Sequence, residues 1–131
     1  MTHMSKNEFN ELVVHTLGNL IDVLKAKQND YTGDDGDPFS NFRLSTLEGV
    51  APETGLMIRV QDKMQRIRTY LSKGELLVVG EGYEDAIHDI IGYMLILKGL
   101  LREQAITHYE ETMTRAEPTL DDLDRDDLGV L

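Results

Sequence analysis

The sequence has no cysteine, no tryptophan and only three prolines among its 131 residues. The absence of cysteine excludes disulfide bonds, thiolate metal ligands and cysteine nucleophiles. No apolar run approaches the roughly 20 residues that a membrane-spanning helix needs. The first residues also lack the basic and apolar segments of a signal peptide. We therefore expect a cytoplasmic protein.

Basic residues are scarce, because 13 Lys and Arg accompany 24 Asp and Glu and leave a formal net charge of −11 at pH 7. Polymeric nucleic acid is bound through Lys and Arg that neutralise phosphates, and anionic membranes attract the same residues. We therefore expect neither as a partner. A free nucleotide stays compatible with this charge, because a divalent cation can bridge carboxylates to phosphates.

Signals for β-strands are also poor, since the β-branched residues are scattered rather than alternating. Apolar residues make up 40% of the chain, which is typical of a globular protein. The length fits a single domain. We expect an all-α domain over residues 6–116, between a flexible leader at 1–5 and an acidic tail at 117–131 that is mobile or docks on a partner subunit.

The first helix is predicted over about residues 6–27. Ser5 and Glu8 have the spacing of a capping box, in which each residue satisfies a backbone N–H of the other at the helix start. Apolar residues then recur at helical spacing and predict one face turned to a core. This apolar stripe consists of Phe9, Leu12, Val13, Leu17, Leu20, Ile21 and Leu24.

A turn-rich loop is expected at 29–42, and it is either functional or a solvated connection held by its aromatic residues. A short helix at 45–49 precedes a long helix at 52–73, which has proline in its first turn and a glycine after its end. The last helix is predicted from residue 83 to at least 102. It continues, broken or bent near Gly99, to about residue 116.

The helix at 52–73 carries a polar stripe of Arg59, Asp62, Lys63 and Arg66. Their i, i+3, i+4, i+7 spacing places them on one face. An exposed ladder of ion pairs is a common alternative, in which each pair contributes roughly 0.3–0.5 kcal/mol. Taken alone, the stripe favours that alternative.

A second stripe consists of Glu81, Asp85 and Asp89, with Glu84 and His88 beside it. Carboxylates at i, i+4 and i+8 repel one another unless something neutralises them. A solvated face is the alternative, but the same helix becomes largely apolar further along, which favours the floor of a cleft. Ligands with oxygen donors alone select Mg²⁺ or Mn²⁺. His88 receives no role.

Three segments resemble a known family. Residues 27–31 (KQNDY) are similar to its K-x-x-D-Y-G, residues 58–66 (IRVQDKMQR) to its R-x-x-D-K-x-x-R, and residues 84–93 to its E-D-x-x-x-D-x-x-x-Y. The stretch 27–100 thus resembles the nucleotide-modification-associated domain found in phages, a branch of the all-α NTP pyrophosphohydrolase superfamily with MazG and the dimeric dUTPases. Thr32 stands where the family has glycine, and only Asp62 stands near the superfamily's Glu-x-x-Glu pair.

The resemblance implies a four-helix, MazG-type module that assembles as a dimer or tetramer, in the host cytoplasm if a phage encodes it. It implies Mg²⁺- or Mn²⁺-dependent hydrolysis of an NTP or dNTP to the monophosphate and pyrophosphate, for nucleotide-pool control or DNA base modification. A guanine-selective enzyme of a 2-aminoadenine DNA pathway is one variant of this activity. The expected site has catalytic Asp62 and Asp89; metal ligands Asp62, Glu84, Asp85 and Asp89; and substrate contacts Lys27, Asp30, Tyr31, Arg59, Lys63 and Arg66.

Two other functions fit the composition. One is a non-enzymatic acidic protein that mimics DNA or inhibits a DNA-binding protein, although a mimic does not need the cations of the first stripe. The other is a structural helical bundle. The last helix also predicts a homo-oligomer, because its apolar residues exceed one core stripe. The surplus residues are Tyr93, Leu95, Ile96 and Leu100, which either a second subunit or the segment 103–116 would cover.

Overall fold

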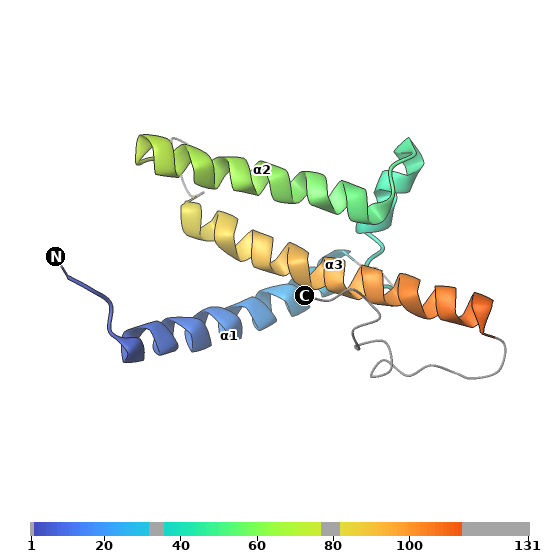
Figure 1. The fold of residues 1–131 in the computed structure, drawn as a ribbon, viewed down its shortest axis with the longest axis horizontal. Helices are drawn as coiled ribbons and strands as arrows, with labels where there is room; N and C mark the ends of the chain where they lie inside the picture. Colours follow the sequence, from blue (N-terminus) through green and yellow to red (C-terminus); the bar gives the residue numbers. More distant parts are fainter. Residues whose placement is uncertain (1, 32–35, 77–81, 114–131) are drawn as a thin grey trace.

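A computed structural model describes residues 2–31, 36–76 and 82–113. These residues form helices α1 (Lys6–Tyr31), α2 (Pro52–Lys73) and α3 (Tyr83–Thr112) and the 3₁₀ helix η1 (Phe42–Glu48). No strand occurs in these ranges, so the all-α prediction is confirmed. The central helix is α3, which lies between α2 and α1 and packs against both (Figure 1). In the described part, none of the helices combines the length and apolar character needed to cross a membrane.

Local sequence signals set most helix ends. At the start of α1, Glu8 donates its backbone N–H to Ser5 Oγ at 3.1 Å, and Ser5 donates its own to Glu8 Oε2 at 2.8 Å. The predicted capping box is therefore confirmed. Helix α2 has Pro52 in its first turn, and Gly74 ends it in a left-handed conformation with φ of 78°. The predicted 52–73 boundaries are also confirmed.

The structure differs from the predictions at the end of the first helix and at the expected break near Gly99. The loop was expected from residue 29, but α1 continues through residues 29–31. No glycine or proline precedes Gly33 in this stretch, and Asn, Asp and Tyr each cost at most about 0.7 kcal/mol in a helix. In addition, α3 is one helix through Gly99. That glycine accommodates a close neighbour, because a Cβ there would lie 2.6 Å from Cζ of Phe39.

The core lies where α2 and α1 pack on α3. Its most buried side chains are Leu56 of α2 and Leu100 of α3, each 1% exposed. Leu100 was predicted to need cover from a second subunit or from the segment 103–116, but it is already buried in the single chain, where α3 packs against both α2 and α1. Leu95 is exposed, as that prediction requires.

The apolar stripe of α1 is covered only in part. Leu20 is buried, and it approaches α3 with Leu24 at the buried Gly92. The stripe was predicted to face a core, but in the described single chain the members away from this crossing are exposed. These are Phe9, Leu12, Val13, Leu17 and Ile21. The expected tail at 117–131 lies outside the described residues.

Candidate functional site

A pocket of about 340 Å³ lies between α1, α3 and the segment that precedes η1. This volume is within the range of small-molecule sites. Much of the wall is apolar, and each of the three long helices also contributes a charged group to it. The lining includes the aromatic residues Phe39, Phe42 and Tyr93 and the charged residues Lys27, Arg59 and Asp89.

The aromatic wall of the pocket, formed by Phe39, Phe42 and Tyr93, is held by specific ring contacts. The rings of Phe42 and Tyr93 meet edge to face, with centroids 6.4 Å apart and planes at 83°. The Arg59 guanidinium lies 5.0 Å from the centroid of Phe42, in a cation–π contact. Such a wall offers flat apolar faces to a planar ligand group.

Asp89 joins the three long helices at the charged end of the pocket. Its Oδ2 lies 3.1 Å from Nζ of Lys63 on α2, and its Oδ1 lies 3.8 Å from Nζ of Lys27 on α1. Two lysines therefore flank one carboxylate, and Arg59, which lines the same pocket, adds a third cationic group. This local excess of positive charge, in a chain of net charge −11, favours an anionic ligand such as a phosphate.

The structure brings some of the predicted site residues together and leaves others apart. Lys27, Arg59 and Asp89 line the pocket, and Lys63 reaches it through its ion pair with Asp89. The side chain of Tyr31 lies outside the described part of the protein. The predicted residues that do not line the pocket are Asp30, Asp62, Arg66, Glu84 and Asp85.

The carboxylates do not form a metal shell in the described part of one chain. Asp85 accepts the backbone N–H of Gly82 at 3.1 Å, so it caps the start of α3. Asp89 is paired with two lysines. Within residues 2–31, 36–76 and 82–113, no three His, Asp or Glu side chains are grouped so that they could hold an ion. This arrangement does not fit the oxygen shell that the resemblance implies, and the Mg²⁺ or Mn²⁺ site stays a prediction.

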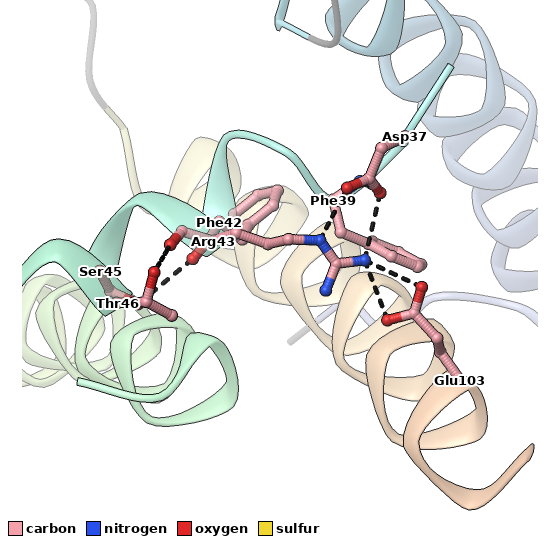
Figure 2. A network of polar contacts seen from close by, with 7 residues as sticks. All are labelled: Asp37, Phe39, Phe42, Arg43, Ser45, Thr46 and Glu103. Carbon is pink, nitrogen blue, oxygen red and sulfur yellow. Dashed lines mark hydrogen bonds and ion pairs between the residues drawn. The ribbon is translucent and has the colours of Figure 1, made fainter. Parts of the chain in front are cut away.

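A polar network beside the pocket had no signal in the sequence. Arg43 of η1 bonds both Asp37 and Glu103 (Figure 2). The hydrogen bond from Arg43 holds the pKa of Asp37 below its ordinary value, against an opposing effect of burial. The same carboxylates raise the pKa of Arg43 further above neutrality. Because Glu103 is 60 residues from Arg43, local spacing could not have found this contact.

Comparisons of the chain with protein-family models, with curated proteins and with solved structures found no match. The pocket combines an aromatic wall with the charged residues Lys27, Arg59 and Asp89, and Asp89 is also paired with Lys63. This combination suits a ligand that has a flat ring system at one end and several negative charges at the other.

Proposed function

We propose that the protein binds a nucleoside triphosphate in this pocket and hydrolyses it to the monophosphate and pyrophosphate. One observation carries the proposal. The three segments that resemble the NTP pyrophosphohydrolases are far apart in the sequence, yet each contributes to the same pocket. Residues 27–31 contribute Lys27, residues 58–66 contribute Arg59, and residues 84–93 contribute Asp89 and Tyr93.

The charged end of the pocket is the place for the phosphates. Lys27, Arg59 and Lys63 would each donate charged hydrogen bonds to phosphate oxygens, which are stronger than neutral ones. A triphosphate would also compete with Asp89 for the two lysines and release its carboxylate. We therefore expect Asp89 to be the carboxylate nearest the reacting phosphate. Water is added across the bond between the α- and β-phosphates, and pyrophosphate leaves.

Metal dependence and assembly are further parts of this proposal. We expect Mg²⁺ or Mn²⁺ to be required, with Asp62, Glu84, Asp85 and Asp89 as the candidate ligands. We also propose a homodimer or homotetramer that completes a four-helix, MazG-type bundle. The exposed apolar residues of α1 support this, since Phe9 and Ile21 are each 53% exposed in the single chain.

A pyrophosphate-release screen tests the proposal. The purified protein is incubated with each NTP and dNTP, including 2-amino-dATP, in Mg²⁺, in Mn²⁺ and in a chelator. We expect release from at least one substrate, with the rate lost in the chelator. An acidic interaction protein would release none. Failure to release pyrophosphate from every substrate in both metals would contradict the proposal.

A melting experiment separates the enzyme from a purely structural bundle. A ligand that binds the folded state raises the melting temperature by an amount that grows with its concentration. We expect a rise with a non-hydrolysable nucleotide and Mg²⁺ together. A structural bundle predicts the same melting temperature with and without them.

A further inference from the structure

Arg43 connects three parts of the protein through one guanidinium group. Its Nε and Nη2 bond the two carboxylate oxygens of Asp37 at 2.7 and 3.2 Å. Its Nη2 also bonds both oxygens of Glu103 on α3, at 2.8 and 2.9 Å. Figure 2 shows the guanidinium between the two carboxylates. The planar fork of arginine suits this geometry, which the single ammonium of lysine cannot reproduce.

The same group of residues fixes the ring of Phe39. Asp37 Oδ1 accepts the backbone N–H of Phe39 at 3.0 Å. The Arg43 guanidinium lies 5.8 Å from the centroid of the Phe39 ring. The ring rests against Gly99 of α3, where even a methyl group would be too close. The ring is therefore held by the backbone, by a cation and by the surface of α3.

Arg43 holds the segment 37–42, and this segment forms part of the pocket wall. Phe39 and Phe42 both line the pocket, whereas Arg43 does not. Without the bonds to Glu103, the segment would lose its polar attachment to α3 at this point. A ligand would then have to order the two rings on binding, and that ordering weakens affinity.

We propose that Arg43 is a positioning residue, which orders Phe39 and Phe42 so that they stack on a planar group of the ligand. Under the proposed function, on which this inference rests, that planar group is the nucleobase. Arg43 thus contributes to recognition of the base and leaves the phosphate contacts of Lys27 and Lys63 in place, because both lysines are paired with Asp89 and not with either ring.

Ring positions can be measured without any ligand. The chain has three phenylalanines, so 4-fluorophenylalanine labelling gives three ¹⁹F NMR signals. In Arg43→Met we expect the signals of Phe39 and Phe42 to shift or broaden, while the signal of Phe9 on α1 stays in place. Gln104→Ala is the matched control, because it removes a different contact of α3, the 2.9 Å hydrogen bond from Gln104 to Glu53 on α2. Unchanged signals of Phe39 and Phe42 in Arg43→Met would overturn the inference, whatever the protein binds.

Binding is then compared for two probes, α,β-methylene dGTP and inorganic tripolyphosphate, by calorimetry with Mg²⁺ present. The wild type should prefer the nucleotide, because stacking strengthens binding by roughly 5- to 150-fold. Arg43→Met should lose most of this preference and keep its affinity for tripolyphosphate. Arg43→Lys, which keeps the charge without the fork, should not restore it. A structural role alone would weaken both probes equally, and that result would overturn the inference.

One further variant and its control test the contact between the Phe39 ring and α3. Gly99→Ala should displace the Phe39 ring and reproduce the loss of nucleotide preference, whereas Gly18→Ala on α1, which meets open space, should not. If both changes act on one wall, Arg43→Met combined with Gly99→Ala should lose no more than either alone. Additive losses would overturn the shared mechanism. A wild type that binds neither probe would refute the proposed function as well, whereas normal preference in Arg43→Met would refute only the role of Arg43.

Discussion

Replacing Lys63 by alanine separates a phosphate contact from a structural ion pair. Lys63 lies 3.1 Å from Asp89, and about 28–29% of each of the two side chains is exposed. Pairs this accessible to water contribute about 0.2–1 kcal/mol to the free energy of unfolding. Alanine also favours the helix slightly. We therefore expect Lys63→Ala to lower the melting temperature by only a few degrees.

The effect on nucleotide binding should be larger. A hydrogen bond to a charged group contributes about 1.5–3 kcal/mol, which corresponds to roughly 10- to 150-fold in affinity. Calorimetry with α,β-methylene dGTP and Mg²⁺ measures this loss. The matched control is Lys98→Ala, which removes the same charge from an exposed position of α3 outside the pocket. Equal affinities for the two variants would refute a phosphate contact by Lys63.

The other predictions concern catalysis, the core, acid stability and assembly. Asp89→Asn should abolish hydrolysis while circular dichroism stays unchanged, and wild-type turnover would contradict the catalytic assignment. Leu56→Ala should lower the free energy of unfolding by about 2–5 kcal/mol in denaturant titrations, because Leu56 is 1% exposed; a loss below about 1 kcal/mol would argue against this core. Because the bond from Arg43 lowers the pKa of Asp37 in the folded state, ionised Asp37 stabilises the fold at pH values above its ordinary pKa of 3.8. This stabilisation is lost as the pH falls below that value. Between pH 5 and pH 3 the melting temperature of the wild type should therefore fall further than that of Arg43→Met, and equal decreases would contradict the ion pair. Light scattering should give a dimer or tetramer, and an active monomer at micromolar concentration would contradict assembly.

The parts of the fold that local chemistry determines were predictable from the sequence. Proline in the first turn and Gly74 after the last turn gave the bounds of α2. The Ser5 and Glu8 pair gave the start of α1. Each of these signals acts within a few residues of the position it defines. The charged residues Lys27, Arg59 and Asp89 were also predicted as site residues, and they do lie at one pocket.

Features that depend on contacts between distant segments were not predictable. The burial of Leu100 follows from the central position of α3, which no local pattern reveals. From the sequence, Gly99 indicated a break or bend in the last helix, but in the fold it provides room for the ring of Phe39. Asp85 resembled a metal ligand, and its contact with the backbone of Gly82 is a capping role that fits its place in the first turn equally well. The bond between Arg43 and Glu103 joins segments 60 residues apart.

The identity of the products tests the central claim most directly. The protein is incubated with the best substrate of the screen in ¹⁸O-labelled water, and the products are followed by ³¹P NMR and mass spectrometry. Attack at the α-phosphorus predicts a nucleoside monophosphate that carries one ¹⁸O atom and an unlabelled pyrophosphate. A nucleoside diphosphate with free phosphate, or label in the pyrophosphate, would contradict the proposed function.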